Sequence, residues 1–217
     1  MAEPSGLLAV GGDLSLPRLK RAYSMGIFPW YDEESPILWW SPDPRPALFP
    51  ANLRVPRRLE RTLRQGRFRV TLDRDFAGVI RACAGVCRKG EPGTWIIPDM
   101  ILAYEALFAA GLAHSAEAWR DGELVGGLYG VALGRAFFGE SMFHLARDAS
   151  KVAFVHLVRF LGRQDFAFID CQQATGHMLR FGAEELPRDK FLALLGRASQ
   201  RECLPGPWNI NSGETVL

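Results

Sequence analysis

The amino-acid sequence predicts an α+β fold whose principal sheet is mixed and mostly antiparallel. The chain has 217 residues, which is enough for one sizeable domain with a small appendage. From residue 67 onward, strand-like and helix-like hydrophobic patterns follow one another. A strong hairpin signal, Asp121-Gly122, joins two strand-like segments in this part. We therefore expect a small N-terminal α/β domain over residues 1–50 and a larger domain, long enough to hold an active site, over residues 51–217.

The first residues are typical of a strand followed by a helix. Residues 6–10 are apolar and lead into glycines. Ser15 is placed to cap a helix from Leu16 to Met25, and Gly26 is a natural end for it.

An aromatic, proline-rich stretch comes next. Trp30, Trp39 and Trp40 are three of the six tryptophans. The prolines around them exclude a long helix, so rigid loops and short strands should present these rings. Two interpretations stay open: a small aromatic core, or an aromatic surface that stacks on a base or an adenosine.

An arginine-rich window between residues 52 and 70 opens the larger domain. It is opposed only by Glu60, and such a window is either a solvated face or a surface that binds phosphates. We favour contact with a polyanion. The arginines in this window are Arg54, Arg57, Arg58, Arg61, Arg64, Arg67 and Arg69.

The remaining elements follow from periodicity and from turn or cap residues. Helices are expected over residues 75–84, from Pro98 to Gly111, after Asp148 or Ser150, and after Pro187; strands are expected over 114–120, 124–132, the segment around Glu140, and 166–170. This order is typical of an N-acyltransferase fold of the acetyltransferase (GNAT) type. No loop of the kind that holds the coenzyme A pyrophosphate is found, so the acyl donor should be something else.

Glu140 occupies an unusual position, between aromatic residues of a predicted strand. Under strict alternation it shares a face with Phe138 and Met142, so its charge would lose hydration unless it has a partner or a chemical role. An outward-facing glutamate is the simpler alternative. We favour a lined pocket.

Composition narrows the class of protein. A net charge of +2 is too small to indicate nucleic-acid binding by itself. Cys83 and Cys87 make only half of a zinc site, so we expect free thiols and no metal among the four cysteines. No apolar run reaches membrane-spanning length and no signal peptide is seen, so we expect a cytoplasmic protein that does not bind membranes.

Taken together, nine sequence blocks in order closely resemble the bacterial leucyl/phenylalanyl-tRNA-protein transferases, from about residue 5 to about residue 195. The blocks are Gly11-Gly-Asp-Leu-Ser15, Ala22-Tyr23 with Gly26-Ile-Phe-Pro-Trp30, Trp39-Trp-Ser-Pro-Asp-Pro-Arg45, Gly93-Thr-Trp-Ile96, Ala113-His-Ser115, Leu124-Val-Gly-Gly-Leu-Tyr-Gly130, Phe138-Gly-Glu-Ser-Met-Phe143, Ala149-Ser-Lys151 and Ile169-Asp-Cys-Gln172.

The resemblance implies transfer of Leu, Phe or Met from aminoacyl-tRNA to the N-terminal Arg or Lys of a protein, which marks that protein for degradation. It implies no cofactor, because an aminoacyl ester is already activated. It also implies a small N-terminal domain joined to an acetyltransferase-like catalytic domain.

The resemblance also assigns roles to residues. Asp170 and Gln172 match the pair that orients and helps to deprotonate the attacking amine, and Glu140 matches the glutamate that holds the donor amino group. Trp30 resembles the residue near the 3′ adenosine, and we place Trp95 with it in substrate binding. By alignment, the donor pocket falls on Leu128, Phe137, Phe154, Leu157 and Ile169, each of which is equally an ordinary core residue. For tRNA contact we favour Arg54, Arg57, Arg58, Arg61 and Arg64.

One departure and two alternatives stay open. Arg180-Phe181 stands where Ser-Leu is expected, which could shift donor or acceptor preference. The enzyme alternative is a related N-acyltransferase or peptidyl ligase with a small-molecule or cell-wall acceptor. The non-enzyme alternative is a tRNA-binding module. We expect a monomer.

Overall fold

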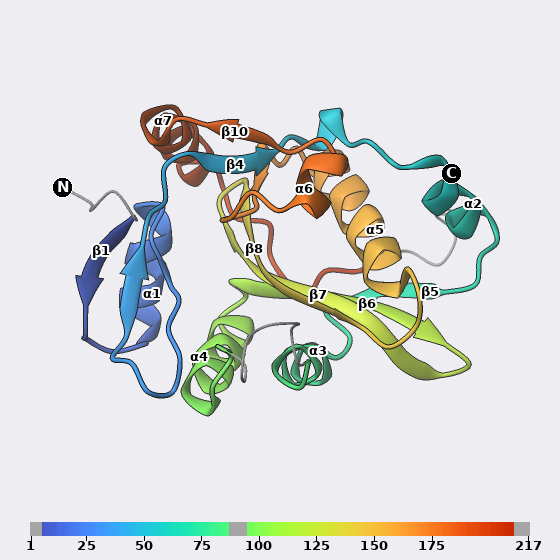
Figure 1. Cartoon of the computed structure of the whole chain (residues 1–217), viewed down its shortest axis with the longest axis horizontal. Helices are drawn as coiled ribbons and strands as arrows, with labels where there is room; N and C mark the ends of the chain where they lie inside the picture. Colours follow the sequence, from blue (N-terminus) through green and yellow to red (C-terminus); the bar gives the residue numbers. More distant parts are fainter. Residues whose placement is uncertain (1–5, 87–94, 211–217) are drawn as a thin grey trace.

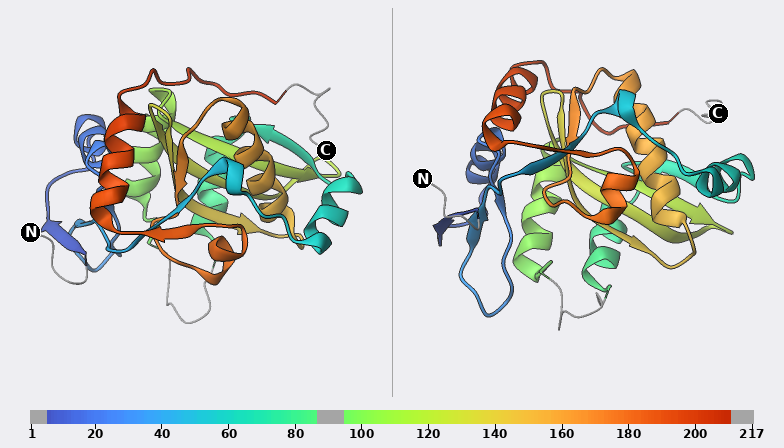
Figure 2. Two further views of the ribbon diagram at one scale, coloured as in Figure 1. Left: turned by 90° about the horizontal axis from the view of Figure 1, so that it is seen from above. Right: turned by 45° about the horizontal axis from the view of Figure 1, so that its top comes forward.

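The computed structural model describes residues 6–86 and 95–210, and it contains two sheets with helices around them (Figure 1). The predicted α+β class is confirmed. A small antiparallel sheet has the strand order β1-β3-β2, and the large sheet has the order β10-β4-β9-β8-β7-β6-β5. The small sheet and α1 lie at one end of the molecule, and α2 lies at the other end (Figure 2).

The large sheet is antiparallel except at one pair of strands. β8 and β9 are parallel and are joined by α5, which covers one face of the sheet. α3 and α4 cover the other face. The strands are β1 (Leu7–Val10), β2 (Phe28–Pro29), β3 (Leu38–Trp40), β4 (Arg45–Leu48), β5 (Arg69–Leu72), β6 (Ala113–Arg120), β7 (Glu123–Leu133), β8 (Ala136–His144), β9 (Phe168–Asp170) and β10 (Glu184–Leu186).

The helices agree with most of the sequence-based predictions. α1 (Leu16–Ser24) ends before Gly26, whose φ is +72°, and Asp121 and Gly122 adopt the positive φ values of the predicted hairpin turn. The remaining helices are α2 (Arg57–Arg64), α3 (Phe76–Ala84), α4 (Pro98–Ala109), α5 (Ala149–Arg163), α6 (Gly176–Arg180) and α7 (Arg188–Ser199), with a 3-10 turn at Pro50–Asn52.

Several details differ from the predictions. The Ser15 side chain makes no capping hydrogen bond, and the Asp13 carboxylate accepts from the Ser15 backbone N–H. The sequence analysis did not identify α2, α6, β4 or β10. These elements are short, and β4 and β10 contain prolines or charges that hide their strand character.

β4 ties the region before residue 50 to the large sheet. It pairs with β9 on one side and with β10 on the other. The boundary between residues 50 and 51 stays a prediction. The pairing means that the segment after the tryptophans directly supports the strand that carries Asp170.

A β-bulge in β8 corrects the alternation assumed for Glu140. Gly130 pairs with Gly139 and Tyr129 pairs with Ser141, so Glu140 is the extra residue. Phe138 therefore packs in the core on the α3–α4 side, whereas Met142 packs against the core on the α5 side. The expectation that Phe138 and Met142 share a face was wrong. The extra residue shifts the alternation by one position, so the residues after it point to the opposite face from the one that strict alternation predicts.

Candidate active site

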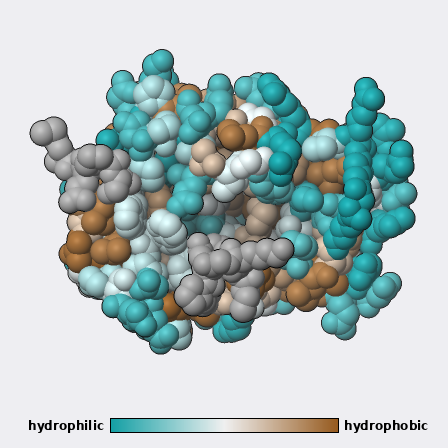
Figure 3. Space-filling view, in the orientation of Figure 1, coloured by the Kyte–Doolittle hydropathy of each residue, from teal (hydrophilic) through white to brown (hydrophobic). Residues whose placement is uncertain are grey.

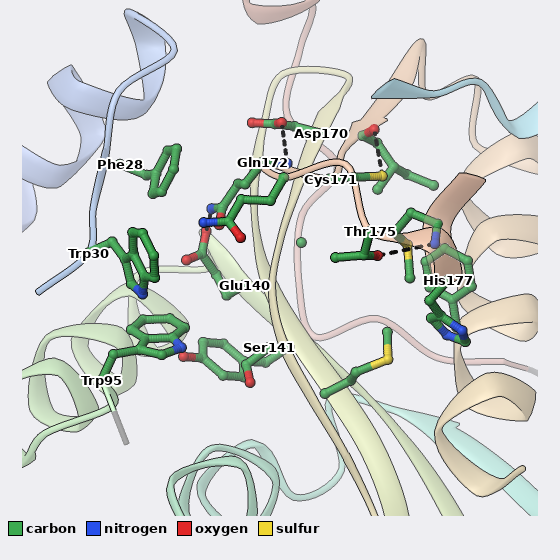
Figure 4. Close-up of a pocket in the computed structure, with 17 residues that line it drawn as sticks. Phe28, Trp30, Trp95, Glu140, Ser141, Asp170, Cys171, Gln172, Thr175 and His177 are labelled. Carbon is green, nitrogen blue, oxygen red and sulfur yellow. Dashed lines mark hydrogen bonds between the residues drawn. The ribbon is translucent and has the colours of Figure 1, made fainter. Parts of the chain in front are cut away.

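A cavity of about 470 Å³ opens where β8, β9 and the segment after β9 meet the aromatic residues of the N-terminal region (Figure 4). The surface is hollowed near the centre of the face shown in Figure 3. Residues from several elements line this cavity, which we call the main cavity. They include Phe28, Trp30, Trp95, Glu140, Met142, Phe154, Ile169, Asp170, Gln172, His177 and Met178.

Glu140 and Asp170 both line the main cavity. Gln172 connects them: its backbone N–H donates to Asp170 Oδ1 at 2.9 Å, and its Nε2 donates to Glu140 Oε1 at 2.9 Å. The proposed triad of polar residues is therefore one hydrogen-bonded unit.

Two buried tyrosines hold the Glu140 carboxylate. Tyr23 donates to Oε1 at 2.8 Å and Tyr104 donates to Oε2 at 3.0 Å, while the two hydroxyls lie 2.5 Å apart. Burial raises the pKa of Glu140 to about 7, although the hydrogen bonds from Tyr23, Tyr104 and Gln172 oppose that rise. Near neutral pH this carboxyl group can therefore exist in either protonation state, which suits a group that binds an ammonium or exchanges a proton.

The Asp170 side chain is fully buried and is held in a bidentate ion pair. Arg45 Nε and Nη2 donate to its two oxygens at 2.8 and 2.7 Å. The side chains of Arg45 and Asp170 are 1% and 0% exposed. The Arg45 guanidinium also lies over the rings of Phe28 and Phe191, at 4.7 and 4.9 Å from their centroids. Asp170 is consequently fixed in place and shielded from solvent.

The turn after β9 places Gln172 at the cavity. Gln172 has a φ of +58°, which is uncommon for a residue with a side chain, and the Asp170 carboxylate accepts its N–H in this conformation. Cys171, between them, also lines the cavity. Burial raises the pKa of the Cys171 thiol, so it stays protonated and is a poor nucleophile.

Aromatic side chains form one wall of the main cavity. Trp30 and Trp95 lie near each other on this wall, together with Phe28 (Figure 4). Trp30 is held from behind, since its ring packs edge-on against Trp40 and its carbonyl accepts from Trp40 Nε1 at 2.7 Å. The tryptophans divide between the two interpretations that the sequence left open. Trp39 is buried in an aromatic core, and Trp30 lines the cavity, where a base could stack on it.

The apolar end of the main cavity contains only part of the expected donor pocket. Phe154 and Ile169 line it, together with Met142 and Met178, which the sequence analysis did not select. The other three residues, Leu128, Phe137 and Leu157, are at most 3% exposed in the core on the α5 side and are not among its lining residues.

The sequence analysis did not single out Tyr23, Tyr104 and Arg45. Tyr23 and Arg45 belong to the sequence blocks that carry the family resemblance, and this membership was a weak indication that they matter for function. Tyr104 lies in the predicted helix from Pro98 to Gly111, where nothing in the sequence distinguishes it from its neighbours. Its contact with Glu140 spans 36 positions, and no local pattern encodes such a contact.

The arginines chosen for tRNA contact lie on or just before α2 and are exposed. α2 packs on the protein through Leu59, so Arg57, Arg58, Arg61 and Arg64 project to solvent, as does Arg54 before it. Hydrophilic side chains gather along this end of the molecule (Figure 3). Within the part of the chain that the structure describes, Arg64 is the one of these five arginines with an ion-pair partner, Glu60 at 3.2 Å.

Two further properties concern metals and membranes. Within residues 6–86 and 95–210, no group of His, Cys, Asp and Glu side chains could hold a metal ion. Cys83, Cys171 and Cys203 are free thiols, and Cys87 lies outside the described residues. None of the described helices is long and apolar enough to cross a membrane.

Comparison with known proteins gives consistent matches over nearly the whole chain. The family model described as leucyl/phenylalanyl-tRNA protein transferase matches residues 47–196, and the model of the N-terminal domain of the same family matches residues 12–43.

Named relatives extend these matches. A leucyl/phenylalanyl-tRNA–protein transferase from Solidesulfovibrio magneticus is 68% identical over 96% of this chain and 84% of the relative. The protein of the same name from Anaeromyxobacter sp. (strain Fw109-5) is 60% identical over 99% of this chain and 91% of the relative.

Similar solved structures are distant. One is a conserved protein of unknown function from Staphylococcus epidermidis, with 9% identity, a TM-score of 0.43, and coverage of 83% of this chain and 68% of the other. Another is L-PGS from Bacillus licheniformis, with 11% identity, a TM-score of 0.40, and coverage of 87% and 71%. At these scores the likeness decides nothing about this chain.

Proposed function

Because the chain belongs to the leucyl/phenylalanyl-tRNA-protein transferase family and is thus an aminoacyltransferase, we propose that the main cavity is where it transfers the amino acid. The donor is the aminoacyl ester of a tRNA, carrying Leu, Phe or Met. The acceptor is a protein whose first residue is Arg or Lys, which is thereby marked for degradation. The observation that carries this proposal is the hydrogen-bonded Glu140–Gln172–Asp170 unit between an aromatic wall and an apolar end.

The two ends of the main cavity suit the two ends of an aminoacyl-adenosine. The donor side chain enters the apolar end beside Phe154, Ile169 and Met178, and the adenine stacks on the wall formed by Trp30 and Trp95. Leu128, Phe137 and Leu157 shape this pocket from behind. One methylene in such a pocket is worth only about 1–3 kcal/mol, so Leu, Phe and Met are all accepted.

Glu140 holds the α-amino group of the donor amino acid. Its carboxylate lines the main cavity and is fixed by three donors. A carboxylate held in this way positions an ammonium group without rearrangement, which keeps the ester carbonyl in place for attack.

The bond changes at the ester require only proton transfer and charge stabilisation. The acceptor amine forms a C–N bond with the ester carbonyl carbon, the C–O bond to the tRNA ribose breaks, and the ribose hydroxyl leaves with the proton that the amine gives up. Gln172 orients the incoming amine through its side-chain carbonyl oxygen, because its Nε2 is engaged with Glu140. Asp170 acts through Gln172, since Arg45 and the Gln172 N–H engage both of its oxygens.

Several broader proposals accompany this one. The large domain is of the acetyltransferase (GNAT) type, with the domain boundary near residue 50. Arg54, Arg57, Arg58, Arg61 and Arg64 contact the tRNA backbone. The protein acts as a monomer in the cytoplasm, where aminoacyl-tRNA is made.

The test is a transfer assay. Phe-tRNA labelled in the amino acid is mixed with a protein that begins with Arg, with an otherwise identical protein that begins with Ala, and with a cell-wall precursor amine. We expect base-stable label in the first protein only. Label in the precursor amine, or none in the Arg protein, would overturn the proposed acceptor. Charge reversal at Arg57 and Arg58 should weaken tRNA binding and flatten its salt dependence.

A further inference from the structure

A second, smaller cavity lies between α2, α5 and α6, and we propose that it holds a backbone phosphate of the single-stranded 3′ end of the donor tRNA. Its volume is about 130 Å³, and its lining includes Arg58, Lys151, His177 and Arg180. We call it the cationic pocket. The proposal rests on the proposed function, because it names a subsite for the donor.

The charge in the cationic pocket comes from three separate elements. Arg58 belongs to α2, Lys151 to the first turn of α5, and Arg180 to the last turn of α6. The only acid among the lining residues is Asp148, and it is engaged by Lys151, whose Nζ lies 2.8 Å from Oδ1. Lys151, Arg147 and Arg58 hold the pKa of Asp148 below its usual value. The pocket therefore carries a net positive charge.

Arg58 and Arg180 are available for a ligand. Both side chains are exposed, and neither has a hydrogen-bonded or ion-paired partner within the described residues. His177, whose pKa is lowered by burial and then by Lys151, Arg180 and His144, adds a neutral imidazole. Two free guanidinium groups around a small hollow match the oxygens of a phosphodiester.

The position of the cationic pocket connects two predicted parts of the tRNA site. Arg58 extends from α2, the helix of the predicted tRNA arginines, while His177 lines both the cationic pocket and the main cavity. α6, which carries His177 and Arg180, lies beside α5 on the side of the main cavity (Figure 1). A single-stranded tRNA 3′ end that runs from α2 to the main cavity would thus pass the cationic pocket before its last nucleotide reaches the main cavity.

Transfer assays with three donor substrates of decreasing size distinguish the contribution of the cationic pocket from that of the rest of the tRNA site. They are Phe-tRNA, Phe on the trinucleotide CCA, and Phe-adenosine, which has no phosphate. Arg180→Ala should lower kcat/KM by about three- to tenfold with Phe-tRNA and with Phe-CCA, and by clearly less with Phe-adenosine. The salt dependence with Phe-CCA should fall by about 0.7 in log–log slope, the value for one phosphate on a single strand.

Matched variants make the result specific. Arg61→Ala, on α2 but outside the lining of the cationic pocket, should lower kcat/KM with Phe-tRNA but much less with Phe-CCA. Arg197→Ala, an exposed arginine on α7, should change none of the three values. Equal losses by Arg180→Ala with all three donors, or no loss with Phe-CCA, would overturn the inference.

Direct binding distinguishes failure of this inference from failure of the proposed function. The affinity of a labelled ACCA oligonucleotide, measured by fluorescence anisotropy, needs no transfer. We expect Arg180→Ala and Lys151→Gln to weaken it, with unchanged thermal unfolding for Arg180→Ala. Unchanged affinity in both variants rejects the cationic pocket as a phosphate site, even if transfer is observed. Weakened affinity without any transfer by the wild type supports the pocket and rejects the proposed function.

Discussion

The buried ion pair between Arg45 and Asp170 leads to a quantitative prediction. Asp170→Asn keeps the size of the side chain but leaves the Arg45 guanidinium, whose side chain is 1% exposed, without a counter-charge. Breaking a buried pair in this way costs about 3–5 kcal/mol. Whole domains are stable by only about 5–15 kcal/mol, so the loss should be large.

Urea unfolding of four proteins measures this cost and its origin. These are the wild type, Asp170→Asn, Arg45→Met and the double variant. Each single change leaves the other buried side chain without its partner. The double variant should therefore be more stable than the sum of the two single losses in unfolding free energy predicts, by about 2–3 kcal/mol. Single losses below about 1 kcal/mol, or strict additivity, would refute the idea that the pair acts as one buried unit.

Transfer kinetics separate the structural and chemical consequences of the pair. Asp170→Asn should also slow transfer, since the Gln172 N–H loses its charged acceptor and the unusual turn is less well held. Gln172→Ala is the matched control. It should slow transfer with a smaller loss of stability, because the removed amide donates to Glu140 in the main cavity and leaves no buried charge without a partner. A Gln172→Ala variant with wild-type kcat would contradict the role proposed for this amide.

Four further predictions follow from the same site. The rate of transfer should rise with pH through about 7 as Glu140 ionises, and Glu140→Gln should remove that limb of the profile; a limb that persists in the variant would implicate another group. Since the folded pKa of Glu140 lies above the usual value of 4.5, its contribution to unfolding free energy should decline as pH rises from 4.5 to about 7, and the urea midpoint of Glu140→Gln should not share this decline. Tyr104→Phe removes the donor to Oε2, so the midpoint of the pH–rate profile should move upward; an unmoved midpoint would contradict this contact. Phe154→Ala should favour larger donors by enlarging the apolar end, measured as the ratio of kcat/KM for Phe and Leu, and an unchanged ratio would exclude Phe154 from the donor pocket.

The sequence by itself determined the elements that have local signals. Gly26 ends α1 and Asp121-Gly122 turns the central hairpin, each through backbone preferences of a few neighbouring residues. For the start of α5 the sequence left Asp148 and Ser150 open, and the structure has Asp148 at the N-cap. The sequence blocks also identified the family and drew attention to Glu140 and Asp170. Both residues line one cavity in the folded protein.

Only the tertiary structure decided how those two acids are held. The partners of Glu140, Tyr23 and Tyr104, lie 117 and 36 positions away, and the partner of Asp170, Arg45, lies 125 positions away. The bulge at Glu140 likewise appears only when β8 is paired with β7. Periodicity reports which face of an element a side chain occupies, but burial and pairing between distant segments set the charge state and orientation of these carboxylates, and those depend on the folded arrangement as a whole.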